Sequence, residues 1–412
     1  MTRKLVLTLL TIALGLAAGA TAALAATAGT AADPGVTPTS VVLGGTAPLT
    51  GWQSGYASIA RGARAYFDYV NSRGGVNGRR ITYTVLDDLS DSGQAASATR
   101  KLVEQDGVFA VFNAFGTEQN LAVRDYLNQK KVPQLFAASG ATAFGSDAGA
   151  YPYTIGLRPT YTAEGWVLGQ YLARTQGTAR VGVLYENDGY GQELLAGLRN
   201  GVQRSKVKVV SAQPSDVSAP DVEAQVARLR VSGANVLAVF ASAKHTDQAL
   251  KYANRLGWKP KLTVGGSAAA SAPLVVDASE KGANRLVKGM VAVTYLKDPT
   301  DPRWASDASM KLYRRVLKRY APGADANDVY HVYGMAAAWT AAEAIRRAGA
   351  DLTRDRLVQI VGSLNVQGNP FLIPGISLKT GPGDHFPIDQ MLLERWQKSG
   401  WRSFGGIWGY RG

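Results

Sequence analysis

The stretch GVFAVFNAFGTEQNLAVRDYLNQKKVPQLFAASGAT, residues 107–142, shows the pattern on which the chain is built. Its apolar runs at 108–112 and 132–137 have the length and composition of buried parallel strands. Between them, most apolar residues fall on one arc of a helical wheel, which is typical of a helix lying on a sheet. The stretch therefore predicts one strand–helix–strand unit of a parallel sheet.

The loops that follow these two strands are rich in small and polar residues. Thr117 can cap the helix, and the loop before it can present backbone N–H groups to a carboxylate. The second loop, residues 139–142, offers the hydroxyls of a serine and a threonine beside a glycine. The residues alone leave open whether these are ordinary loops or half of a ligand pocket. The candidate contact residues in the two loops are Phe115, Gly116, Thr117, Ser139, Gly140, Ala141 and Thr142.

The first residues predict export. Arg3 and Lys4 precede an apolar run that ends in small residues, which is the pattern of a secretory signal peptide over 1–25. Residues 26–39 predict a flexible leader, and no later segment approaches ~20 uninterrupted apolar residues. The chain has no cysteine, so it has neither disulfides nor a cysteine that could carry a lipid. We expect a free periplasmic protein, and a monomer.

The rest of the chain repeats the opening pattern. Strand and helix alternate over 41–137 and again over 181–264, which favours two α/β lobes, each with a parallel sheet. Residues 388–401 predict a hairpin. Later helices need a sheet to cover, and we assign to the first lobe those predicted at 301–320, 327–348 and 353–364.

Composition and motifs argue against catalysis and nucleic-acid binding. The formal net charge is +14, but Lys and Arg are scattered, and their densest group, at 311–319, fits the exposed face of a helix. The three histidines lack metal-ligand spacing. An exported α/β hydrolase would need a G-x-S-x-G elbow, and 265–269 lacks its last glycine. We therefore expect no enzyme, catalytic residue, metal, cofactor or nucleic-acid partner.

Several segments, in this order, resemble the leucine/isoleucine/valine-binding family of periplasmic receptors for ABC importers. The resemblance implies two doubly wound lobes joined by a three-segment hinge, as in type I periplasmic binding proteins. It places lobe 1 at 40–157 plus 295–383 and lobe 2 at 158–294 plus 384–412, with crossings near 157–159, 293–295 and 383–386. The segments that carry it are RGARAYFDYVNSRGGVNGRRI (61–81), KLVEQDGVFAVFNAFGT (101–117), VPQLFAASGAT (132–142), VGVLYENDGYGQELLAGLRNGV (181–202) and GDHFPIDQMLLERW (383–396).

The resemblance also implies a binding site between the lobes. Family members bind a ligand carboxylate at the positions of Gly116, Thr117, Ala141 and Thr142, and place aromatic rings on its apolar part. These rings would be Trp52 or Tyr56, together with Tyr190. Loops of the second lobe add two further candidates, Ser242 and Ser267.

One departure from the family leaves the ligand open. Amino-acid receptors of this type usually place an acid where 265–268 reads Gly-Gly-Ser-Ala. Because a buried ammonium group needs an acceptor, either Glu186 or Asp188 takes this role or the ligand has no ammonium. Lys244 could meet a second anionic group.

The family implies a function in import. We expect a receptor that delivers a branched-chain or other hydrophobic amino acid to a membrane ABC permease. The alternative is the same role for a small aromatic or aliphatic carboxylate or an amide, and a third is a sensor that reports its ligand to a membrane partner.

Overall fold

The computed structural model describes residues 33–398 and 400–410. The predicted signal peptide and the predicted leader up to residue 32 lie outside the described residues. The end of that leader is joined to the first sheet, because Val36 bridges to Val41 and the backbone N–H of Val42 donates to the Gly35 carbonyl at 2.8 Å. None of the helices in this described part combines the length and apolar character needed to cross a bilayer.

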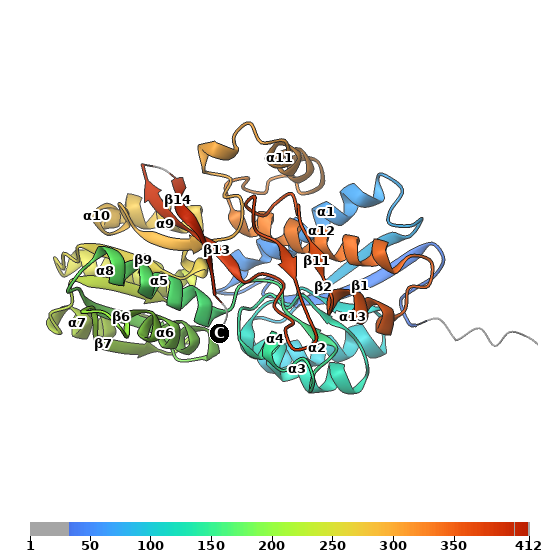
Figure 1. Cartoon of the computed structure of the whole chain (residues 1–412), viewed down its shortest axis with the longest axis horizontal. Helices are drawn as coiled ribbons and strands as arrows, with labels where there is room; N and C mark the ends of the chain where they lie inside the picture. The colour runs from blue at the N-terminus through green and yellow to red at the C-terminus, as the bar shows by residue number, and fades with distance from the viewer. Residues whose placement is uncertain (1–32, 399, 411–412) are drawn as a thin grey trace, which may run out of the picture. The chain divides into compact units, whose positions relative to one another are not determined.

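The first sheet has five parallel strands in the order β2-β1-β3-β4-β5. Its alternation of strands and helices confirms the unit predicted at 107–142 (Figure 1). The second strand of that unit is shorter than predicted, because Phe136 has a φ of 58° and leaves the extended conformation. The strands are β1 (Ser40–Ala47), β2 (Arg80–Asp87), β3 (Ala110–Phe112), β4 (Gln134–Leu135) and β5 (Thr154–Ile155), and the helices are α1 (Ala57–Asn71), α2 (Ser92–Glu104), α3 (Thr117–Gln129) and α4 (Ala143–Ser146).

The second sheet has seven strands in the order β14-β13-β10-β9-β8-β6-β7. Five are parallel, and the predicted hairpin adds an antiparallel pair at one edge. The parallel strands are β6 (Arg180–Glu186), β7 (Lys208–Ser215), β8 (Val236–Phe240), β9 (Leu262–Gly265) and β10 (Val291–Thr294), and the hairpin is β13 (Gln390–Gln397) and β14 (Gly400–Gly409). The helices are α5 (Tyr161–Thr175), α6 (Gly189–Val202), α7 (Glu223–Val231), α8 (Ala243–Arg255), α9 (Ala272–Ala278) and α10 (Asn284–Val287).

Three later helices belong with the first sheet, as predicted from their need for a partner. Their buried residues share one hydrophobic core with β1 and α1. The contact with α1 is close, because a Cβ on Gly62 would lie 2.3 Å from the His331 carbonyl oxygen and one on Gly334 would lie 2.0 Å from that of Ile59. The segments are α11 (Ala308–Tyr320), α12 (Val329–Ala348) and α13 (Arg354–Val361), followed by the short strands β11 (Asn365–Val366) and β12 (Leu378–Lys379).

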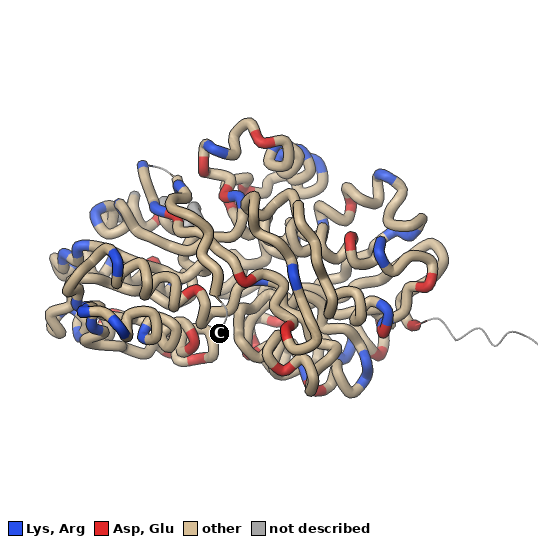
Figure 2. The backbone as a smooth tube through the Cα atoms, viewed as in Figure 1, with Lys and Arg blue, Asp and Glu red and all other residues tan. Residues whose placement is uncertain are grey.

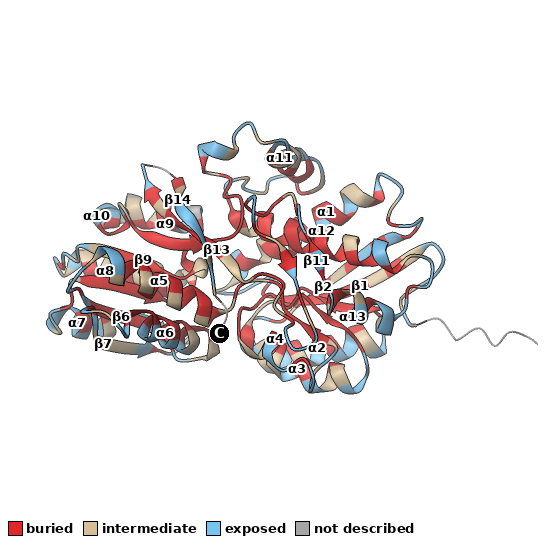
Figure 3. Ribbon diagram, in the orientation of Figure 1, coloured by how far each residue is buried: buried red, intermediate tan, exposed pale blue. Residues whose placement is uncertain are grey.

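The chain passes between the two sheets three times. It leaves the first sheet after β5, returns to the first core after β10, and enters the second sheet again at β13. The limits of the two lobes remain a prediction. Buried residues follow the strands and the inner sides of the helices (Figure 3). Lys and Arg are spread over many helices and loops instead of one element (Figure 2).

Candidate functional site

A cavity of about 350 Å³ lies where the parallel strands of both sheets end. Its wall includes residues that directly follow the carboxyl ends of β2, β3, β6, β8 and β9. Loops at these ends are free to vary without disturbing the sheet, which is why α/β proteins bind ligands there. The volume suits a small molecule.

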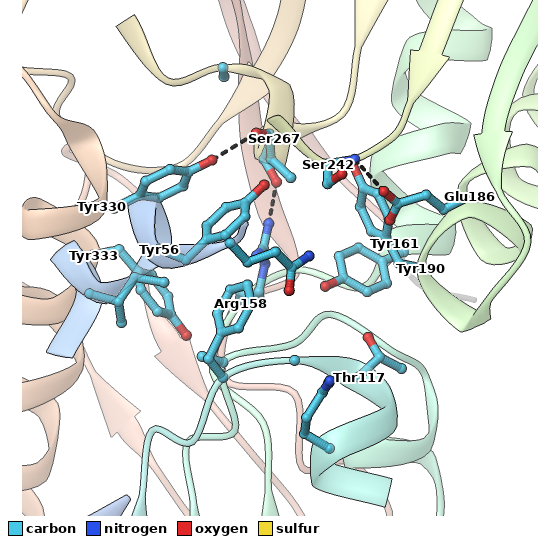
Figure 4. Close-up of a pocket in the computed structure, with 18 of the residues that line it drawn as sticks. Tyr56, Thr117, Arg158, Tyr161, Glu186, Tyr190, Ser242, Ser267, Tyr330 and Tyr333 are labelled. Carbon is cyan, nitrogen blue, oxygen red and sulfur yellow. Dashed lines mark hydrogen bonds between the residues drawn. The ribbon is translucent and has the colours of Figure 1, made fainter. Parts of the chain in front are cut away.

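Aromatic rings form much of this wall (Figure 4). Tyr56 stacks on Phe115 with 4.7 Å between ring centroids, and Tyr161 meets the Tyr190 ring edge-on at 4.8 Å. Burial raises the pKa of the Tyr56 and Tyr190 hydroxyls, so both groups are neutral at physiological pH. The rings that line the cavity are Tyr56, Phe115, Tyr161, Tyr190, Tyr295, Tyr330 and Tyr333.

Seven of the predicted contact residues lie in the cavity wall. Helix α3 differs locally from the prediction, because its N-cap is Gly116 and Thr117 is its first residue. Gly116 has a φ of 98°, a conformation that favours glycine. The Thr117 hydroxyl instead shares a hydrogen bond of 2.8 Å with the Ser139 hydroxyl. The predicted residues in the wall are Tyr56, Phe115, Gly116, Thr117, Tyr190, Ser242 and Ser267.

The other predicted contacts lie outside the wall, at positions that the structure uses differently. The Thr142 backbone N–H and hydroxyl donate to the carboxylate of Glu193 on α6, at 3.0 and 2.8 Å. This loop thus binds a carboxylate, but one that belongs to the protein. Trp52 is 41% exposed and lies under the Lys244 ammonium group, 5.9 Å from it. The predicted residues outside the wall are Trp52, Ser139, Gly140, Ala141 and Thr142.

Both acids proposed to replace the missing carboxylate line the cavity. The buried Glu186 side chain accepts the Ser242 backbone N–H at 2.7 Å, and burial raises its pKa to about 7. Asp188 caps α6 by accepting the Gly191 N–H at 3.0 Å, and burial raises its pKa as well. Lys244 lies outside the wall and donates to the Ala219 carbonyl at 2.9 Å.

Sequence reasoning missed a buried ion pair at the cavity. Arg158 lies in the first crossing segment, and its Nη2 donates to the Glu164 carboxylate at 3.1 Å and to the Ser267 hydroxyl. Glu164 also accepts the Ser267 N–H and hydroxyl, at 3.0 and 2.7 Å. The position of Arg158 was a usable signal, because a predicted hinge segment borders the cleft that it closes.

Several contacts join residues carried by the two sheets beside the cavity. The Ala243 N–H donates to the Tyr56 hydroxyl at 3.2 Å, the Tyr330 hydroxyl donates to the Ala268 carbonyl at 2.7 Å, and Glu193 holds Thr142. The cavity is therefore bounded by residues that both sheets carry. Within 33–398 and 400–410, no group of three or more His, Cys, Asp or Glu residues could hold a metal ion. The wall offers a ligand aromatic rings, hydrogen-bonding groups and charged side chains.

Comparison with known proteins agrees with this architecture. Residues 40–400 match the family model described as periplasmic binding protein. A Leu/Ile/Val-binding protein homolog from Brucella abortus is 28% identical over 321 residues, which is 76% of this chain and 79% of the relative.

Solved structures share the fold over most of the chain. A branched-chain amino acid ABC transporter protein from Thermus thermophilus with bound valine has a TM-score of 0.80 at 19% identity, over 91% of this chain and 98% of that one. A fatty acid ABC transporter substrate-binding protein from Thermomonospora curvata has a TM-score of 0.76 at 21% identity, over 92% and 95% of the two chains.

Proposed function

Because the chain belongs to the periplasmic binding protein family that includes the Leu/Ile/Val-binding proteins, we propose that it is the solute-binding protein of an ABC importer. It would capture its solute outside the cytoplasm, as a monomer and without catalysis, and deliver it to a membrane permease. The observation that carries this proposal is the ring-lined cavity enclosed between the strand ends of two parallel sheets. Closure around a ligand is the motion that such an arrangement permits.

The favoured solute is a hydrophobic amino acid. The rings would bury its side chain, and Glu186, with Asp188 beside it, would accept its ammonium group. The relative's name and the bound valine in the Thermus thermophilus structure support this class of ligand for this chain.

A carboxylate that lacks an ammonium group is the second candidate. The pKa of about 7 leaves Glu186 partly neutral at physiological pH, so the cavity tolerates a ligand that offers it no cation. Arg158 supplies positive charge in the wall. The name of the Thermomonospora curvata protein is compatible with such a ligand.

A thermal-shift screen of the mature protein tests both candidates. Leucine carries a carboxylate and an ammonium group. Isocaproate keeps only the carboxylate, leucinamide keeps only the ammonium group, and isocaproamide has neither. Phenylalanine, hydrocinnamate and the matching amides form a second set. A solute at ~100 times its Kd stabilises the fold by about 2.7 kcal/mol. Leucine or phenylalanine should raise the melting temperature most; a rise with the acids and none with the amino acids would contradict the favoured solute.

The importer role has its own test. Purified protein loaded with its solute should stimulate the ATPase activity of its ABC permease reconstituted in vesicles. No stimulation, together with binding to another kind of membrane protein, would favour a sensor.

A further inference from the structure

In the predicted carboxylate-binding loop, residues 139–142, several hydrogen-bonding groups already have partners within the protein. Glu193 accepts both the Thr142 N–H and the Thr142 hydroxyl. The Ser139 hydroxyl bonds with Thr117 and accepts the Ala141 N–H at 3.1 Å. Ser139, Ala141 and the backbone around them are buried, so the loop has little left to offer a ligand.

Arg158 is the one cationic side chain among the described residues that line the cavity. The hydrogen bonds that its guanidinium makes to described residues both start at Nη2, and its buried Nε has no partner. Burial works against its charge, but nearby Tyr295, Tyr161 and Glu164 raise the pKa of Arg158 above its ordinary value. The guanidinium is therefore charged and retains unused donors.

The surroundings of Arg158 favour strong binding of an anion. The guanidinium carbon lies 5.3 Å from the centre of the Tyr161 ring, and Tyr295 and Tyr333 also line this part of the cavity. Charge-assisted hydrogen bonds are strong where rings exclude water. Figure 4 shows Arg158 next to Ser267 and Glu186 next to Ser242, so Arg158 and Glu186 occupy different parts of the wall.

We propose that the ligand's carboxylate binds at Arg158 and not at the 139–142 loop, where Glu193 takes its place. This inference rests on the proposed solute-binding function and adds the residue that selects an anionic ligand. It applies to an amino acid and to a simple carboxylate, because both carry the group that Arg158 would bind. Glu164 then acts as a positioning residue, which holds the guanidinium and partly offsets its charge.

The test compares isocaproate with isocaproamide, and hydrocinnamate with its amide, by calorimetry on three forms of the protein. Removing Arg158 alone would leave Glu164 buried and unpaired, so Arg158→Gln is combined with Glu164→Gln, which keeps hydrogen-bonding groups at both positions. This double variant should bind the acids at least about tenfold more weakly and the amides as before. Circular dichroism and the unliganded melting curve check its fold.

Glu164→Gln alone is the matched control. It removes the competing negative charge and keeps Arg158, so it should bind the acids more tightly than the wild type does, with no change for the amides. A purely structural role for Arg158 predicts no such gain.

Each other outcome is decisive. Acids that bind the double variant as tightly as the wild type, or a wild type that binds the amides as tightly as the acids, would overturn this inference and leave the proposed function standing. A wild type that binds no member of either set, and neither leucine nor phenylalanine, would overturn the proposed function itself.

Discussion

Glu186 combines burial with a single backbone donor, and its ionisation should be visible in the stability of the whole protein. Its pKa of about 7 in the folded state lies above the ~4.3 of an unfolded glutamate. A raised pKa means that the folded state binds the Glu186 proton more tightly than the unfolded state does. The stability that this proton contributes is present at low pH and is lost as the pH rises toward 7.

We therefore expect Glu186→Gln to flatten the pH dependence of the unliganded protein. Between pH ~4 and ~8 the wild type should lose up to about 3 kcal/mol of unfolding free energy more than the variant, measured by urea denaturation. Glu223→Gln, on α7 and outside the cavity wall, is the control and should follow the wild type. Parallel curves for wild type and Glu186→Gln would contradict this assignment.

The same residue should report on the ligand. An ammonium group placed at Glu186 would stabilise the carboxylate, so leucine binding near pH 7 should release protons while isocaproate binding should not. Calorimetry in buffers of different ionisation enthalpy measures the difference. Equal proton release for both solutes would mean that the ammonium group lies elsewhere.

At the scale of the element, the turn before α3 depends on a left-handed residue. Gly116→Ala would force a side chain into a φ of 98° and should cost about 1–3 kcal/mol. Gly74→Ala is the matched control, because Gly74 has a φ of 97° and a Cβ there would meet no atom within 4 Å. Both variants should lower the melting temperature, but only Gly116→Ala should weaken ligand binding. Equal affinities in the two variants would remove this turn from the site.

Helices and strands with a regular spacing of apolar residues could be predicted from the sequence. Those whose limits depend on tertiary contacts could not. The apolar arc and the strand–helix–strand order of residues 107–142 predicted this part of the first sheet. The two-residue β4 could not be foreseen, because the positive φ of Phe136 goes with a buried hydrogen bond to its carbonyl from Asn113. Helices α9 and α10 were not among the predicted elements.

The site was predictable where the strand ends determine it. Glu186 and Ser242 directly follow predicted strands, and both line the cavity. Sequence reasoning missed three other residues of the wall. Arg158 and Tyr295 lie in predicted crossing segments, and Tyr330 lies at the start of a helix assigned to the first lobe. The positions of Tyr295 and Tyr330 at the cavity depend on how distant parts of the chain pack, whereas Arg158 could have been found from its place in the first predicted crossing.

For the whole molecule, the contact between Glu193 and Thr142 should favour the closed form. Glu193→Ala should leave the unliganded protein more open, with a larger radius of gyration by small-angle X-ray scattering. The variant should bind acids and amides alike about tenfold more weakly, because the lost contact involves no ligand atom. Asp106→Asn, in an exposed ion pair with Lys101, is the control. A selective loss of acid binding would mean that this loop meets the ligand.

The three crossings between the sheets also govern how the chain can fold. Helix α1 is covered by α12, and the Asn113 amide donates to the Tyr333 hydroxyl at 3.3 Å, between residues 220 positions apart. The first core even includes Leu392, so it cannot be completed until almost the entire chain is available. Such distant partners must meet at a cost in chain entropy. Synthesis or translocation therefore precedes folding here, and a fragment that stops after β10 should leave the apolar side of α1 uncovered and aggregate.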